Sequence, residues 1–341
     1  MNYIDGIDKK VIEYFKILEP EFPEWLNDYI NTESLLKTQY ISVSCGTMYS
    51  DLFDCKFFYS SLEHSIAVAL IVWHFTHDKK QTIAGLFHDI ATPSFKHCVD
   101  FLDGDYMNQE STEDLTSKII ADSEDIISLL KRDGIKLSEI DDYHIYPIAD
   151  NDTPRLAADR LEYSLSNALL QYNIWDENKV KEIYEDINVQ KNEEGIDELG
   201  FKTKKIAREF VKTTSIMSVW YRDEKRTFSM QFIADVLKRL NADGKIKRED
   251  LYNLGEKEVI DIIQNSKYKD VFDIWKNAKE LKISKEKPEG VYSTCIQSKV
   301  RYINPLVNGE RIYDICKIAK RMIDKNLAYK VTDYAYLDFN F

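Results

Sequence analysis

The most constraining feature of the sequence is a strongly apolar run at residues 61–77, SLEHSIAVALIVWHFTH. Ser60 followed by Glu63 has the spacing of a capping box, which predicts that a helix begins here. The run is shorter than a membrane-spanning segment, so it favours a buried helix inside a folded core. A second helix is predicted at about residues 79–90. It ends before Thr92-Pro93, because the residue preceding a proline disfavours the helical conformation.

Helical periodicity dominates most of the remaining chain. Further helices are predicted at residues 8–18, 22–31, 111–132, 228–241, 256–282 and 309–326, and another from Thr153-Pro154 to about residue 172. Residues 178–216 also indicate helix, with a loop at QKNEEGIDELG, and residues 38–59 indicate an irregular, aromatic-rich cover for the core. Only VYSTCIQSKVRYI and the tail AYKVTDYAYLDF are typical of strands. The expected fold class is therefore mainly α.

The charge and the cysteines restrict the classes of function that the sequence is compatible with. The net charge of −13 opposes binding to nucleic acid over the whole surface, although a local basic pocket for a small nucleotide is compatible with it. The five cysteines are odd in number and none has CxxC spacing. The charged N-terminal sequence is unlike a signal peptide. These features predict a cytoplasmic protein with free thiols and no membrane attachment.

Three side chains in the two central helices are candidate metal ligands. His64 lies in the first turns of the 61–77 helix, and His88-Asp89 lies in the last turn of the next one. Each has an ordinary alternative: His64 as a core histidine bound to a backbone carbonyl, and His88-Asp89 as a solvated helix end. The helix dipole disfavours an aspartate at a helix C-terminus, however, so a cation is expected beside Asp89.

Asp159 is a fourth candidate ligand. In TPRLAADRLEYSLSNALL it shares a helical stripe with Leu156 and Tyr163. A carboxylate on a buried stripe requires a partner, because its desolvation is costly. From the residues alone, pairing with Arg160 or Arg155 is as good an explanation as metal ligation.

Taken together, the order H…HD…D on three predicted helices resembles the HD phosphohydrolase superfamily. The segment SLEHSIAVA is similar to the one that carries the first histidine, and LAADRLEYSL to the one that carries the last aspartate. GLFHDIATPSFKH resembles the HD segment of the subgroup that includes the deoxynucleotide triphosphohydrolases. The resemblance covers about residues 40–175, and SKVRYINPLV weakly resembles a C-terminal element of bacterial members.

The resemblance implies a fold and a domain organisation. The fold is an HD-domain helical bundle with an additional helical C-terminal region and a few short β-strands. We expect an N-terminal helical arm at 1–45 and a metal-binding core at 46–175. A mostly helical region follows at 176–341, with short strands near 291–303 and 328–339.

The resemblance also implies metal-assisted hydrolysis of a phosphoester. His64, His88, Asp89 and Asp159 would hold a divalent ion, and this mixed nitrogen and oxygen set suits Mn, Fe, Ni, Mg or Zn. The implied substrate-binding residues are Lys96, His97, Arg160 and Tyr163, and the implied catalytic residues are Asp89, Glu110 and His97. The ordinary alternatives are a surface charge at Arg160, a core aromatic at Tyr163 and a segment cap at His97.

Three positions depart from the triphosphohydrolase pattern. Thr92 and Gln109 stand where that subgroup has histidines, and Ser61 stands where it has an arginine. Threonine and glutamine cannot act as a general acid or base near neutral pH. Glu110, Asp114 or His144 could provide acid–base help, and the spacing does not choose among them.

Three functions compete at this point. The leading hypothesis is a phosphohydrolase acting on a small phosphorylated substrate, with a nucleotide favoured. The alternative is a non-catalytic nucleotide- or metal-binding regulatory protein on an HD scaffold, motivated by Thr92 and Gln109. The third is a helical interaction protein without a metal. The sequence does not indicate the oligomeric state; similar proteins often form dimers or larger assemblies, so a homo-oligomer is suggested by analogy alone.

Overall fold

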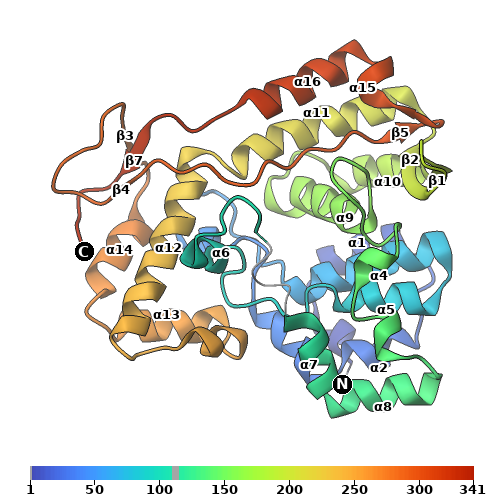
Figure 1. The fold of residues 1–341 in the computed structure, drawn as a ribbon, viewed down its shortest axis with the longest axis horizontal. Helices are drawn as coiled ribbons and strands as arrows, with labels where there is room; N and C mark the ends of the chain where they lie inside the picture. Colours follow the sequence, from blue (N-terminus) through green and yellow to red (C-terminus); the bar gives the residue numbers. More distant parts are fainter. Residues whose placement is uncertain (1, 110–114) are drawn as a thin grey trace.

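The computed structural model describes residues 2–109 and 115–341. Its helices and short strands confirm the mainly α class (Figure 1). The first half of the described chain contains α1 (Lys9–Leu18), α2 (Leu26–Ile30), α3 (Glu33–Leu36), α4 (Ser61–Thr76), α5 (Lys79–Phe87), α6 (Cys98–Asp103), α7 (Thr116–Asp122), α8 (Glu124–Asp133) and α9 (Ala158–Ser166). The second half contains α10 (Glu177–Glu185), α11 (Lys204–Trp220), α12 (Glu224–Ala242), α13 (Glu256–Gln264), α14 (Lys269–Asn277), α15 (Ile312–Ile315) and α16 (Lys317–Ala328).

The strands form two small sheets. One has the order β1-β2-β5-β6 and consists of β1 (Ile187–Lys191), β2 (Asp197–Phe201), β5 (Leu306–Val307) and β6 (Glu310–Arg311). The other has the order β3-β7-β4 and consists of β3 (Lys282–Ser284), β7 (Tyr334–Tyr336) and β4 (Ser293–Thr294). Within residues 291–303, only Ser293–Thr294 forms a strand, and β7 lies in the tail.

Helices α4 and α5 are at the centre of the larger core. The backbone amide of Glu63 donates to the Ser60 hydroxyl at 3.1 Å, and the Ser60 amide donates to the Glu63 carboxylate at 2.6 Å. The predicted capping box is therefore confirmed. Every residue from Ser61 to Val72 is buried, which explains why this helix is apolar on all sides. A Cβ at Gly85 would lie 3.3 Å from Val72 Cγ2, so this glycine lets α5 approach α4 closely.

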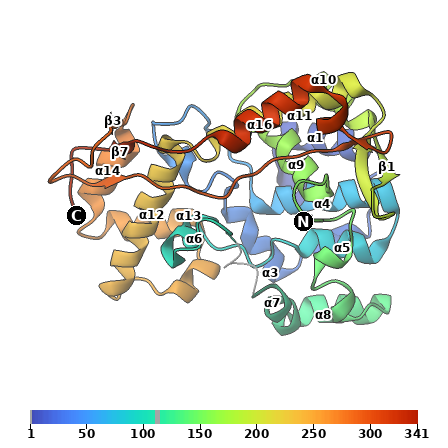
Figure 2. The ribbon, with the colours of Figure 1, turned by 45° about the horizontal axis from the view of Figure 1, so that its top comes forward.

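Two hydrophobic clusters form the interior. The larger joins side chains of α1, α2, α4, α5, α9, α10, α11 and α16. The smaller joins α6, α12, α13, α14 and β7. Figures 1 and 2 show α12–α14 grouped at one end of the molecule, with the α4–α5 pair at the other end and α11 beside α16 along one side. The candidate site lies where residues of both clusters meet.

Two sequence predictions about secondary structure are wrong. Helix α9 begins at Ala158 and not at Thr153-Pro154. The Pro154 carbonyl instead accepts a hydrogen bond from the Asn304 amide at 2.8 Å, so a distant segment holds these residues in a loop. The span 178–216 is interrupted by the β1–β2 hairpin, because β2 also pairs in parallel with β5 and buries Leu199 and Phe201. Pairing with a distant strand can override the local preference for helix, and the local sequence does not reveal it.

Other predicted helices are shorter than expected. The helix predicted at 111–132 divides at Ser123 into α7 and α8, and its residues 111–114 lie outside the described part of the chain. The helix predicted at 256–282 divides into α13 and α14. Among the residues that the structure describes, no helix is both long and apolar enough to cross a membrane.

Candidate metal centre

The structure brings the four predicted ligands together. His64 comes from the first turn of α4, His88 and Asp89 from the end of α5, and Asp159 from the first turn of α9. The Nε2 atoms of the two histidines are 3.2 Å apart. The Asp89 carboxylate lies 3.8 Å from each of these nitrogens, and the Asp159 carboxylate lies 3.2 Å from His64 and 3.7 Å from His88. Helix ends that are distant in sequence thus converge on one point.

The alternative partners of Asp159 are engaged elsewhere. Arg160 pairs with Asp150 at 2.8 Å, and Arg155 pairs with Glu194 at 2.7 Å. Neither arginine makes an ion pair with Asp159 in the described part of the chain. Its carboxylate therefore faces the histidines, and the interpretation of Asp159 as a structural partner of an arginine is wrong.

The outer side of each histidine is held by an acceptor. The Nδ1 of His64 hydrogen-bonds to Glu162, and the Nδ1 of His88 hydrogen-bonds to the Gly85 carbonyl at 2.8 Å. Glu162 is fully buried and also accepts from the Tyr59 hydroxyl at 2.8 Å. With Nδ1 donating, each Nε2 keeps its lone pair directed at the other ligands. This is the tautomer that a metal ion requires.

These donors fit a divalent cation. His64, His88 and Asp89 form a group whose ligand atoms lie within 4.8 Å of one another and can hold a metal ion. In the tautomer with both Nδ1 atoms donating, the two Nε2 atoms of neutral imidazoles face each other at 3.2 Å, and neither can donate to the other. A cation between them and the two carboxylates satisfies all four groups. Two nitrogen and two oxygen donors suit a borderline transition metal.

Without a cation, the charges of the site shift the pKa values of His64, Asp89 and Asp159. Burial disfavours the charged form of His64, yet the Glu162 and Asp159 carboxylates outweigh it and raise the pKa of His64 to about 10. Burial likewise opposes ionisation of Asp89 and Asp159. The surrounding positive groups, Lys96 for Asp89 and His64 for Asp159, nevertheless hold both pKa values well below their usual range.

Lys96 is the positive group expected beside Asp89 at the end of α5. Its ammonium contacts the Asp89 carboxylate at 2.6 Å and is largely buried. Phe95 and Lys96 both have positive φ angles, 66° and 44°, which is unfavourable for residues with a side chain. The Ser94 amide donates to the Leu251 carbonyl at 2.8 Å, so the segment before α13 holds this turn in place.

His97 is oriented by an aspartate that the sequence analysis missed. Its Nδ1 lies 2.8 Å from the fully buried Asp100 carboxylate, three residues on. Its Nε2 lies 3.3 Å from Arg301, whose guanidinium also donates to the Gln109 side chain at 2.6 Å. Burial and the nearby cations Arg301 and Lys96 lower the pKa of His97, although Asp100 opposes them. His97 is therefore neutral at pH 7.

The remaining predicted residues have mixed surroundings. The Arg160 guanidinium donates to the Asn151 and Arg155 carbonyls as well as pairing with Asp150, and it is almost fully buried. His144 lies 3.0 Å from Asp142 and 3.6 Å from Asp150, with about half of its side chain exposed. Thr92 and Ser61 are both buried. Glu110 and Asp114 lie outside the described residues.

All four ligands line a cavity of about 580 Å³, a volume in the range of ligand-binding pockets. Its other polar and aromatic lining residues include Lys96, His97, Gln109, Tyr143, His144, Arg160, Tyr163, Tyr172, Tyr221, Arg226, Arg301 and Tyr302. The sequence analysis missed Glu162, Asp100, Arg226 and Arg301. Glu162 follows Asp159 by three residues, and Asp100 follows His97 by three. This helical spacing could have indicated both contacts from the sequence. Arg301 lies in SKVRYINPLV, the segment that weakly resembles a C-terminal element of bacterial members, whereas no local pattern pointed to Arg226.

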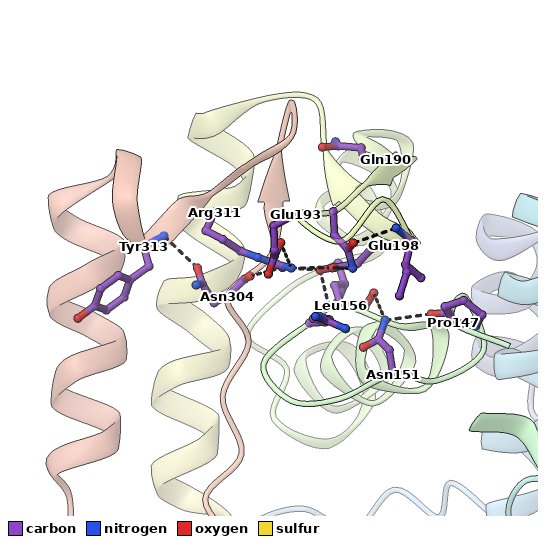
Figure 3. Close-up of polar contacts among 12 residues, drawn as sticks. Pro147, Asn151, Leu156, Gln190, Glu193, Glu198, Asn304, Arg311 and Tyr313 are labelled. Atoms are coloured by element: carbon purple, nitrogen blue, oxygen red, sulfur yellow. Dashed lines mark hydrogen bonds and ion pairs between the residues drawn. The ribbon is translucent and has the colours of Figure 1, made fainter. Parts of the chain in front are cut away.

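A buried ion pair supports the loop that precedes Asp159 (Figure 3). Arg311 of β6 donates to the two carboxylate oxygens of Glu198 on β2, at 2.6 and 2.8 Å. The same carboxylate accepts from the Leu156 amide at 3.2 Å. The Asn151 side chain then donates to the carbonyls of Leu156 and Pro147, at 3.2 and 2.9 Å. The C-terminal region thus fixes the loop beside Arg160.

Comparisons with known proteins agree with this architecture. No family model matches the chain. The uncharacterized protein YdhJ of Bacillus subtilis (strain 168) is 25% identical over 236 residues, which are 66% of this chain and 67% of the relative. A solved structure of a hypothetical protein from Aquifex aeolicus has a TM-score of 0.60 and 15% identity, over 91% of both chains. A phosphohydrolase from Bacteroides thetaiotaomicron VPI-5482 has a TM-score of 0.60 and 13% identity, over 92% of this chain and 96% of that one.

At these identities the likeness establishes the fold alone. It shows that the mainly α architecture of nearly the whole chain is shared with these two structures. The triphosphohydrolase subgroup, by contrast, stays a prediction from sequence motifs.

Proposed function

We propose that this chain is a metal-dependent phosphohydrolase acting on a small phosphorylated molecule, most plausibly a nucleotide. The observation that carries the proposal is the convergence of two imidazoles and two carboxylates at one end of a cavity. The same cavity is lined by Lys96, Arg160 and Arg301. Positive side chains beside a metal centre are what phosphoryl transfer requires, because charge accumulates on the phosphoryl oxygens.

The name of one structural neighbour is in keeping with this proposal. The Bacteroides protein that shares the fold is called a phosphohydrolase. Function does not follow from fold, so the argument rests on the site of this chain.

The proposed roles follow from the contacts. His64, His88, Asp89 and Asp159 would hold the cation, which when bound lowers the pKa of water and polarises a phosphoryl oxygen. Glu162 and the Gly85 carbonyl keep both imidazoles in the ligating tautomer.

Lys96 and Arg301 are placed to bind substrate oxygens. Lys96 contacts Asp89, and Arg301 bridges Gln109 and His97. Both cations line the cavity. We assign Arg160 a weaker role, because Asp150 and backbone carbonyls already occupy its donors. Tyr163, also in the cavity wall, would contact the non-reacting part of the substrate.

His97 is the best proton carrier among the described residues. With Nδ1 bound to Asp100, its Nε2 is the basic atom, and it faces the Arg301 guanidinium at 3.3 Å. A neutral histidine held in this way can take a proton from water and give it to the leaving oxygen. This assignment removes the need for histidines at Thr92 and Gln109, the two positions that depart from the triphosphohydrolase pattern.

The test is product analysis by anion-exchange chromatography. The metal-loaded protein is incubated with Mn²⁺ and a panel of nucleoside mono-, di-, tri- and cyclic phosphates. We expect product from at least one class, and no product from the matched Asp89→Ala protein. Nucleoside with tripolyphosphate identifies a triphosphohydrolase, and free phosphate a phosphatase. Equal turnover by Asp89→Ala, or no turnover of any phosphoester by a protein that binds metal, contradicts the proposal.

A further inference from the structure

One arginine in the cavity wall makes no ion pair with a carboxylate of the described residues and has no role in the site described above. Arg226 stands in the first turn of α12 and lines the same cavity as the four ligands. Its guanidinium donates to the Tyr172 hydroxyl at 2.9 Å and lies over the Phe53 ring, 5.4 Å from the centroid. No hydrogen bond or ion pair between described residues joins Tyr172 to any of the four candidate ligands, so Arg226 belongs to a different part of the cavity wall.

Three other cations of the cavity wall differ from Arg226, since Arg301 contacts His97 and Gln109 and is already assigned to the reacting phosphoester, whereas Lys96 and Arg160 have acidic partners. Lys96 and Arg160 each pair with a carboxylate, at 2.6 and 2.8 Å. No carboxylate among residues 2–109 and 115–341 forms an ion pair with Arg226. Asp223 precedes it by three residues, but its side chain accepts from the Arg226 backbone amide at 2.8 Å and caps α12.

Apart from Asp223, whose carboxylate acts on Arg226 from its capping position, the groups that face the Arg226 guanidinium are neutral. Burial raises the pKa of the Cys45 thiol and of the Tyr172 and Tyr221 hydroxyls, so none of them carries a negative charge at pH 7. The Arg226 Nε atom is buried and has no hydrogen-bond partner among the described residues. A buried cation with otherwise neutral neighbours and an unused donor is unfavourable unless an anion completes the site.

We propose that Arg226 binds a second anionic group of the substrate, a phosphate or carboxylate, while the metal centre holds the reacting phosphoester. The inference rests on the proposed function, because it assumes that the phosphoester is bound at the metal centre. A cavity of about 580 Å³ can hold one small molecule that reaches both places. The planar guanidinium, kept in orientation by Tyr172 and Phe53, suits two-point recognition of such a group.

The consequence is a preference for doubly anionic ligands. A molecule with a single phosphate satisfies the metal centre alone, whereas one with a second phosphate or carboxylate also satisfies Arg226. The substrate class is therefore a phosphoester with an additional anionic group, rather than a simple monoester.

The test compares two matched pairs of probes by isothermal titration calorimetry on the metal-loaded protein, with each phosphoester replaced by a methylene phosphonate that cannot be hydrolysed. One pair corresponds to adenosine 5′-monophosphate and adenosine 3′,5′-bisphosphate. The other corresponds to glycerol 3-phosphate and 3-phosphoglycerate. We expect wild-type protein to bind the doubly anionic member of at least one pair about tenfold more tightly, as one charge-assisted hydrogen-bonded pair provides. Preference in the first pair identifies phosphate, and preference in the second identifies carboxylate.

The matched variants isolate Arg226. Arg226→Met should abolish the preference and leave binding of the singly anionic probes unchanged, which also shows that the variant is folded. Arg226→Lys should retain part of the preference, and Arg321→Met, at an exposed arginine of α16, should retain all of it. The inference is overturned if wild-type protein shows no preference in either pair, or if Arg226→Met keeps it. Neither result bears on hydrolysis by the metal centre, which the product analysis measures separately.

Discussion

The Glu198–Arg311 pair gives the sharpest quantitative prediction, because removing one partner leaves a charge in the interior. Glu198 is fully buried, and the exposed fraction of the Arg311 side chain is only 13%. Arg311→Met removes both donors to the carboxylate while preserving most of the apolar length of the side chain. Breaking a buried pair on one side destabilises a protein by about 3 to 5 kcal/mol. The Leu156 amide and the Asn192 side chain still donate to Glu198, so we expect a value near the lower end.

The expected loss can be measured by urea denaturation and by thermal unfolding. The entropy of unfolding for 341 residues is about 0.7 kcal/mol/K, so a loss of about 3 kcal/mol lowers Tm by about 4 °C. The double variant Glu198→Gln/Arg311→Met removes the unpaired charge and should recover more than half of the loss. As a control on the same hairpin, Lys191→Met breaks an exposed pair with Asp197 and should change the free energy of unfolding by less than about 0.5 kcal/mol.

Two results would refute this reasoning. One is an Arg311→Met protein that is as stable as the Lys191→Met control. The other is a double variant that is no more stable than Arg311→Met alone. Either would mean that the carboxylate finds solvent or new partners when the guanidinium is removed.

Three further predictions concern the site and its surroundings. Asp159→Ala and His88→Ala should each reduce bound metal well below one equivalent, measured by elemental analysis after dialysis; full occupancy in either would exclude that residue as a ligand. Burial raises the pKa of Glu256 to about 8, so the folded protein binds this proton more tightly than the unfolded chain. The free energy of unfolding should therefore fall as pH rises from about 4.5 to 8, by at most about 4 kcal/mol, and a denaturation series should show that Glu256→Gln loses most of this fall. Gly46 has a φ of 76°, and a Cβ there would lie 2.6 Å from Ile233 Cδ1 and 2.8 Å from Phe95 Cδ1; Gly46→Ala should destabilise the protein by about 2 to 4 kcal/mol in the same assay, and a neutral result would show that these side chains move aside.

The structure shows the contacts of Gln109, one of the positions that depart from the triphosphohydrolase pattern. Gln109 is buried and accepts a hydrogen bond from Arg301 through its side-chain oxygen. A neutral amide at this position orients the guanidinium without contributing a proton. We infer that acid–base work at the site falls to His97, which a buried aspartate already orients.

The sequence by itself determined the central helices and singled out the four candidate ligands. The Ser60–Glu63 capping box and the stop before Pro93 are interactions between residues a few positions apart, so the chain encodes them locally. A polar residue on an apolar helical stripe is equally visible, and this pattern singled out His64 and Asp159. The distances among the four candidate ligands, by contrast, could be known only from the tertiary structure.

The tertiary structure alone decided which partners these side chains take. Asp159 could have paired with Arg160, but that arginine instead forms an ion pair with Asp150, which lies in the loop before α9. Arg226 and Arg301 line the cavity from positions 67 and 142 residues beyond Asp159, so no periodicity could reveal them. The β1–β2 hairpin exists because β2 pairs with β5, more than a hundred residues away. These contacts depend on how segments distant in sequence pack together, and short-range sequence patterns do not predict that packing.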